Sequence, residues 1–165
     1  MPMQPDDIEV GIVDSFSCQK IKENMPPIKR LSRVNSAGEE IQAGNLPDDS
    51  RPFVCVGHCG DISQWAEITA TNENGEHLLI ECRWRTWQDG NDSHNCNVRW
   101  KTEAQYINGD VFECNDSVWG QLATNHNTQG HFKIITEDGL KHVREYLVPR
   151  QKNTTPLFPW TPTTP

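Results

Sequence analysis

The sequence has few apolar residues and no long apolar run. Hydrophobic residues make up 35% of the 165 residues, below the roughly 45–50% that is typical of globular chains. No run approaches the ~20 residues that would span a bilayer. The start, MPMQPDDIEVG, has neither the basic nor the apolar region of a signal peptide. We therefore expect one domain with a modest core, made in the cytoplasm and without a membrane partner.

Positive charge is also scarce. The formal net charge is −8, and a general binder of nucleic acid or anionic membranes needs a positive field. No Gly-rich phosphate-binding loop is present. The carboxylates of Glu39-Glu40 and Asp48-Asp49 lie in polar stretches, which indicates solvent-exposed side chains rather than catalytic groups. The charge therefore disfavours nucleic acid as a partner, and no motif assigns a reaction.

What the sequence does contain is a concentration of large aromatics and cysteines. Five of the six Trp and five of the six Cys lie between Arg51 and Gly120. Large aromatics indicate where a polar chain builds its core. We therefore predict an N-terminal arm over 1–52, a core over 53–149 and a Pro/Thr-rich C-terminal arm over 150–165. The cysteines are expected to be free thiols, with a disulfide framework as the alternative.

The core is predicted to be mainly β (α+β), an antiparallel meander that forms a small barrel or sandwich. Asn74-Gly75 and Asn108-Gly109 are hairpin signals. After Thr136, apolar residues recur at helical spacing up to Leu147, and Pro149 ends this C-terminal helix. Strands are expected at 53–56, 65–71, 77–87, 96–107, 110–114 and 131–135, and a further one at 118–122.

The two arms are polar and rich in turn formers. Only one short strand is expected in the N-terminal arm, around Val10 to Phe16. The prolines of the C-terminal arm favour an extended, polyproline-like geometry. Its apolar residues Leu157, Phe158 and Trp160 are predicted to anchor the arm on another surface.

One candidate metal site is Cys55-Val-Gly-His58-Cys59, with His94-Asn-Cys96 as its second half. Thiolate and imidazole are zinc ligands, so the set would be Cys55, Cys59, His94 and Cys96. The gaps of three and one residues differ from the two-residue gap of strong zinc signatures. The alternative is buried free cysteines that pack as small hydrophobes. We therefore predict no cofactor, with zinc as the alternative.

A second candidate is a cysteine nucleophile. Cys59 could begin a short helix, whose N-terminus would lower its thiol pKa. His131 would be the base and Asp138 or Asn127 the orienting group. This order resembles papain-like hydrolases, although no upstream Gln lies in the context of their oxyanion hole. The alternative is a structural Cys and a surface His.

A third candidate is a face that combines basic and aromatic residues. Arg83, Arg85 and Trp87 share one face of their predicted strand, and Arg99 and Lys101 share one face of another. If these strands pair, the patch could bind single-stranded nucleic acid, an acidic glycan or an acidic protein surface. The alternative is an ordinary solvated face on which Arg stems cover aromatics.

The function that these patterns favour is a non-enzymatic structural or interaction protein. A β-rich subunit would be docked by its arms in a larger assembly, with other protein subunits or with copies of itself. The acidic charge and polar loops suit a virion component, such as a capsid-decorating or tail-associated protein. The alternatives are a zinc-stabilised or Arg/Trp-faced binding module for nucleic acid or glycan, and a Cys–His hydrolase.

Overall fold

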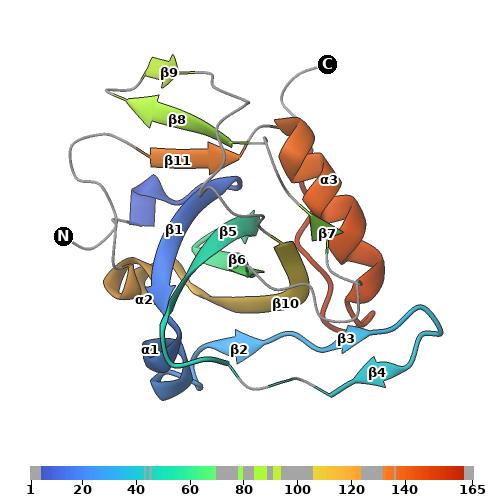
Figure 1. The fold of residues 1–165 in the computed structure, drawn as a ribbon. Helices are drawn as coiled ribbons and strands as arrows, with labels where there is room; N and C mark the ends of the chain where they lie inside the picture. The colour runs from blue at the N-terminus through green and yellow to red at the C-terminus, as the bar shows by residue number, and fades with distance from the viewer. Residues whose placement is uncertain are drawn as a thin grey trace.

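A single twisted antiparallel sheet organises the computed structural model (Figure 1). The structure describes residues 5–42, 44, 46–69, 78–79, 84–88, 91–93, 106–123, 132–135 and 137–161. Among the described residues the sheet has nine strands: eight follow the order β2-β10-β6-β5-β1-β11-β8-β9, and the ninth, β7, pairs with β10. A separate two-stranded sheet consists of β3 and β4.

The strands differ widely in length. They are β1 (Ile12–Ser17), β2 (Lys29–Arg30), β3 (Arg33–Val34), β4 (Glu40–Ile41), β5 (Ser50–Cys59), β6 (Ile62–Thr69), β7 (Leu78–Leu79), β8 (Trp84–Gln88), β9 (Asn91–Ser93), β10 (Tyr106–Asn115) and β11 (Phe132–Ile135). The helical elements within the described residues are α1 (Cys18–Glu23), α2 (Asp116–Leu122), α3 (Glu137–Leu147) and the 3₁₀ turns η1 (Pro5–Asp7) and η3 (Val148–Arg150).

The predicted fold class is confirmed: the chain is mainly β, its sheet is antiparallel, and a helix follows the last strand. The predicted helix is α3, in which Leu140, Val143 and Leu147 are buried. The described strands do not close into a barrel, because β2 and β9 lie at opposite ends of the sheet order. In the part of the chain that is described, no helix is long and apolar enough to cross a membrane.

The N-terminal segment differs from the predicted arm over 1–52. β1 lies inside the sheet, between β5 and β11. Phe16 from β1 and Ile21 from α1 are 0% exposed, and Ile28 is 2% exposed. Each of these apolar residues has polar or proline neighbours in the sequence, so this segment shows no helical or strand periodicity that would predict their burial. They are buried because their partners lie far along the chain.

The predicted hairpin at Asn108-Gly109 does not form. β10 runs through these two residues, and its register against β6 shifts between Ile107 and Val111. Gly109 has φ +96°, a conformation that glycine adopts without steric cost. An Asn-Gly pair that would turn a hairpin here forms a bulge within one strand.

Two further predicted strands are corrected. Residues 118–122 lie in helix α2, in which Trp119 and Leu122 are buried. The predicted strand over 77–87 contains β7 and β8, which pair with β10 and β11 respectively. The turn at 74–75 lies outside the described residues.

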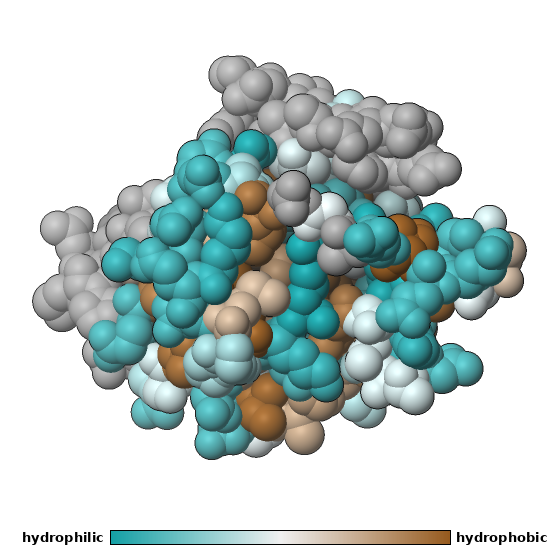
Figure 2. Space-filling view, turned by 90° about the horizontal axis from the view of Figure 1, so that it is seen from below, coloured by the Kyte–Doolittle hydropathy of each residue, from teal (hydrophilic) through white to brown (hydrophobic). Residues whose placement is uncertain are grey.

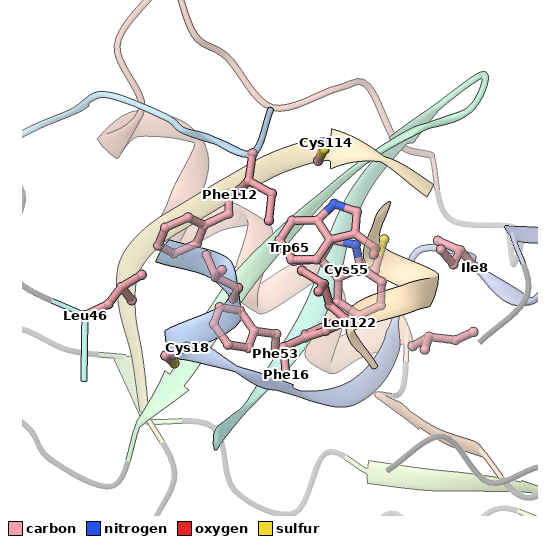
Figure 3. Packing of buried hydrophobic residues seen from close by; sticks show 14 residues of the cluster. Ile8, Phe16, Cys18, Leu46, Phe53, Cys55, Trp65, Phe112, Cys114 and Leu122 are labelled. Carbon is pink, nitrogen blue, oxygen red and sulfur yellow. The ribbon is translucent and has the colours of Figure 1, made fainter. Parts of the chain in front are cut away.

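Both faces of the sheet are covered, so β5 alternates between two cores. Phe53 and Cys55 belong to an aromatic cluster that α1 and α2 cover. Its centre is Phe16, whose ring centroid lies 5.6 Å from that of Phe53 and 5.0 Å from those of Trp65 and Trp119. In Figure 3 the labelled rings of Phe16, Phe53 and Trp65 gather inside this cluster.

The second core is aliphatic and lies on the opposite face, under α3. Val54 and Val56 of β5 and Ala66 and Ile68 of β6 belong to it. The predicted alternation of Ala66 and Ile68 on one face is therefore confirmed. Leu157, from the C-terminal segment, completes this core at 9% exposure.

A carboxyl group is buried on the aromatic side of β6. Glu67 is 5% exposed, and its Oε2 accepts a hydrogen bond of 3.0 Å from Asn108 Nδ2. Desolvation, and then the negative charge of Asp110, raise the pKa of Glu67 above its ordinary 4.5. Folding therefore favours the protonated form, and Glu67 reduces stability as the pH rises above 4.5.

We expect Glu67→Gln to raise the free energy of unfolding at pH 7, because Gln keeps an acceptor for Asn108 and carries no buried charge. The gain should vanish below pH 4.5, where Glu67 is protonated in both states. Urea unfolding at both pH values measures this. The matched control is Glu40→Gln, since the hydrogen bond from Lys152 lowers the pKa of Glu40. That control should not be stabilising, and an equal gain in both variants would contradict the argument.

Candidate interaction site

The C-terminal tail, residues 151–161, lies against the face of the sheet that α3 also covers. Leu157 is buried there, and Trp160 packs against the same core. Side chains of the core hold the tail backbone at Pro156 and Phe158, whereas the beginning of the tail forms an isolated backbone bridge between Gln151 and Arg33 of β3. The groups that contact the tail, or that position those contacts, are here called the tail-binding surface. They are Gly57, Gln64, Arg144 and the carbonyl of Val56.

Gln64 is the centre of the tail-binding surface. It is 0% exposed and projects from β6. Its Nε2 donates to Pro156 O at 3.1 Å, and its Oε1 accepts from Phe158 N at 2.8 Å. The second amide hydrogen goes to Glu113 Oε1 at 2.9 Å. One buried amide thus satisfies a donor and an acceptor of the tail backbone, as a neighbouring β-strand would.

Gly57 provides the space that this arrangement needs. It lies opposite Gln64 in the pairing of β5 with β6, immediately after a register shift in β5. A Cβ at Gly57 would lie 2.2 Å from Gln64 Oε1 and 3.4 Å from Phe158 N. Any side chain at this position would therefore displace the amide from the tail.

Arg144 joins α3, the sheet and the tail. One terminal nitrogen donates to Val56 O, and the other donates to Phe158 O at 2.8 Å. The guanidinium carbon lies 5.9 Å from the ring centroid of Trp160, which is within cation–π range. Desolvation lowers the pKa of Arg144 from its ordinary value, and the guanidinium remains charged.

The beginning of the tail is fixed by contacts with the β2–β3 connection and with β4. Lys152 N and Thr155 Oγ1 both donate to Ser32 O, at 3.0 and 3.1 Å. Lys152 Nζ also pairs with Glu40 at 2.9 Å. Gln151 is 5% exposed, and its amide contacts the carbonyls of Gly109 and Leu147 at 3.4 Å.

We expect Gly57→Ala to loosen the tail, because its methyl group would push Gln64 away from Phe158 N. The loss of about one buried hydrogen bond predicts a destabilisation of roughly 1–2 kcal/mol. Hydrogen exchange of the Phe158 amide should also be faster. The control is Gly44→Ala, where an added Cβ meets nothing within 4 Å. Unchanged exchange at Phe158 in Gly57→Ala would contradict this role of the glycine.

Of the sequence-predicted binding residues, Leu157 is buried in the chain's own aliphatic core and Trp160 packs against that core, whereas Phe158 is half-buried and is held through its backbone N and O. Arg85 and Trp87 lie in β8, whose backbone pairs with β11 and β9. The other members of the predicted basic face lie outside the described residues: Arg83, Arg99 and Lys101.

Gln64 and Arg144 are not among the residues that the sequence predicts to bind. A signal was present for Gln64, since it shares the alternation of Ala66 and Ile68 and so occupies a core-facing position with a polar side chain. A signal was also present for Arg144, which follows the buried Val143 and lies four residues after Leu140 on α3.

The predicted zinc ligands are separated within the described residues. Cys55 is 0% exposed inside the aromatic cluster, whereas Cys59 is exposed at the end of β5. Desolvation raises the pKa of the Cys55 thiol far above its ordinary value. His94 and Cys96 lie outside the described residues. Within those residues, no three His, Cys, Asp or Glu side chains are grouped to hold a metal ion.

The proposed nucleophile does not begin a helix. Cys59 ends β5 and faces Ile62 across a two-residue turn, in which Gly60 has φ +62°. Cys59 therefore lies in a β-hairpin and not at the helix N-terminus that the nucleophile hypothesis requires. Asp138 lies in the first turn of α3, and His131 lies outside the described residues.

His58, which the metal hypothesis included in its motif, has a different partner. Its Nε2 lies 2.7 Å from Oδ2 of Asp116, at the start of α2. Asp116 is 3% exposed, and its Oδ1 has no hydrogen-bond partner among the described atoms. The pair connects the β5–β6 hairpin with α2.

Comparisons with protein-family models, curated proteins and solved structures found no significant match to this chain.

Proposed function

We propose that the chain is a non-enzymatic interaction protein whose β core binds an extended, proline-flanked peptide. Its own C-terminal tail is that peptide, supplied within one chain or by a neighbouring copy in an assembly. The buried amide of Gln64 carries the proposal, because it is committed to two backbone atoms of the tail. Recognition through backbone atoms, with apolar anchors between them, is a common mode of peptide binding.

Exchange of the tail between copies of the chain would use the same contacts. The bonds from Gln64 and Arg144 reach the backbone of Pro156 and Phe158, and they are identical whichever copy supplies the tail. Swapping an identical element is therefore a low-cost route to oligomers. The tail is preceded by the short η3 turn, which contains Pro149. The narrower expectation, a virion component, stays a prediction.

The test uses a chain that lacks residues 156–165 and a labelled synthetic peptide of residues 151–165. We expect saturable binding, measured by fluorescence anisotropy, because the vacant surface keeps Gln64, Arg144 and Val56 O. Gly57→Ala in the truncated chain should weaken binding about tenfold, which corresponds to about 1.4 kcal/mol. Gly44→Ala should leave it unchanged. Binding that is absent, or equal in the two glycine variants, would refute the proposal.

A further inference from the structure

A pocket of about 530 Å³ lies between the main sheet and the small β3–β4 sheet. This volume is within the range of small-molecule sites. Figure 2 looks onto the side where β2, β3 and β4 lie, and hydrophilic residues predominate there, with hydrophobic ones between them. The polar lining residues are Arg30, Ser32, Arg33, Glu40, Gln42 and Asp110.

Two guanidinium groups in this pocket share one carboxylate. Arg30 donates to Asp110 Oδ2 at 2.8 Å, and Arg33 Nε lies 3.6 Å from Asp110 Oδ1. The side chains of Arg30, Arg33 and Asp110 are 16%, 23% and 11% exposed. One carboxylate balances only one of the two positive charges. The second charge is therefore unbalanced in a partly desolvated place, where it acts more strongly than on the open surface.

The other carboxylate in the lining does not supply the missing negative charge. Glu40 pairs with Lys152 at 2.9 Å, and a hydrogen bond from this lysine lowers the pKa of Glu40. The lining and the lysine paired with it thus hold three cations and two carboxylates. The buried carboxyl of Glu67 also interacts with Arg30, but burial raises its pKa and so opposes its negative charge. The pocket is positive on a chain whose formal net charge is −8.

Both arginines are held in place before any ligand arrives. Arg30 donates to Gly44 O at 2.6 Å, and its guanidinium carbon lies 5.3 Å from the ring centroid of Phe112. Arg33 donates to Asn108 O in the bulge of β10. The Nε atoms of both arginines are buried without a hydrogen-bond partner among the described atoms. The donors of this cluster thus outnumber its acceptors, and preorganised guanidinium groups suit a planar or tetrahedral oxyanion.

We propose that this pocket binds a small organic molecule through one oxyanion group, a carboxylate or a phosphate, held by Arg30 and Arg33. Leu31 and Ile41 also line the pocket, so the rest of the ligand meets an apolar wall. A polyanion is disfavoured by the net negative charge of the chain. This site does not include Gln64 or Arg144, although Ser32 and Glu40 of its lining also contact Lys152 at the beginning of the tail. Its test uses the full chain, in which the tail stays in place, so either proposal can fail without the other.

The test titrates the ¹⁵N-labelled full chain with phenyl phosphate and, separately, with benzoate at constant ionic strength. We expect saturable amide shifts confined to residues 30–33 and 40–42, and the probe that binds more tightly identifies the oxyanion. Arg33→Gln should weaken binding at least about tenfold. Arg51→Gln, which removes an arginine paired with Asp49, should leave it unchanged.

A second variant keeps the test decisive if Arg33→Gln does not fold. Gln42→Glu adds a negative charge to the lining and changes no described hydrogen bond, so it should weaken binding by a similar factor. The proposal is overturned if neither probe gives saturable shifts in these two segments. It is equally overturned if a folded Arg33→Gln or Gln42→Glu chain binds as tightly as the unsubstituted chain.

Discussion

Deleting residues 156–165 is expected to abolish self-association while the sheet remains folded. The deletion removes Leu157 from the aliphatic core and leaves Gln64 and Arg144 without their tail partners. Burial of one Leu side chain contributes about 1.5–3 kcal/mol. We therefore expect a destabilisation of that size, with the strand signal of circular dichroism retained. Sedimentation equilibrium of the two chains measures the change in association.

The control for this deletion is removal of residues 162–165 alone, which leaves every described contact of the tail in place. That shorter deletion should associate as the full chain does. If the chain that lacks residues 156–165 self-associates as strongly as the full chain, the tail is not the element that joins the copies.

Phe16→Ala should be among the most destabilising substitutions in the chain, although Phe16 lies in the segment that the sequence predicts as an arm. Its ring is 0% exposed and contacts those of Phe53, Trp65 and Trp119. Truncating a buried Phe to Ala costs about 3–5 kcal/mol. A typical domain has a total stability of about 5–15 kcal/mol, so the loss should be obvious in chemical unfolding.

The matched substitution is Val148→Ala, because Val148 is 52% exposed in η3. It should change the free energy of unfolding by less than about 0.5 kcal/mol. If Phe16→Ala had an equally small effect, β1 would be a peripheral arm, as the sequence predicts, and the aromatic cluster would not depend on it.

The parts of the fold that the sequence predicts well have a clear local period. Ala66 and Ile68 alternate along a strand, and Leu140, Val143 and Leu147 recur along a helix. Such periods arise from the backbone geometry of the element itself. They therefore locate β6 and α3 without knowledge of the rest of the chain.

The errors occur where distant partners determine the structure. Asn108-Gly109 is compatible with a hairpin turn and with a bulge, and the pairing of β10 with β6 selects the bulge. Phe16 belongs to a stretch without a long apolar period, and its burial depends on partners such as Trp119, about a hundred residues away. The local sequence therefore determines neither whether Asn108-Gly109 forms a turn or a bulge, nor whether Phe16 is buried.

The candidate interaction site could be predicted from the sequence only in part. Leu157 and Trp160 are predictable as anchors because they are apolar residues on a polar tail. The surface that receives them is harder to predict: the periods of β6 and α3 indicate that Gln64 and Arg144 face inward, but not that both contact the same segment of the tail. Only the fold brings them together, 80 positions apart on β6 and α3.

The most direct test of tail exchange is a native mass spectrum of an equimolar mixture of two variants. One variant lacks residues 156–165, so it can receive a tail but cannot supply one. The other carries Gly57→Ala, so it can supply a tail but receives one poorly. Tail exchange between copies predicts a heterodimer that is more abundant than the homodimer of either variant. Single-chain masses only, in the mixture and in the full chain at every concentration, would contradict it.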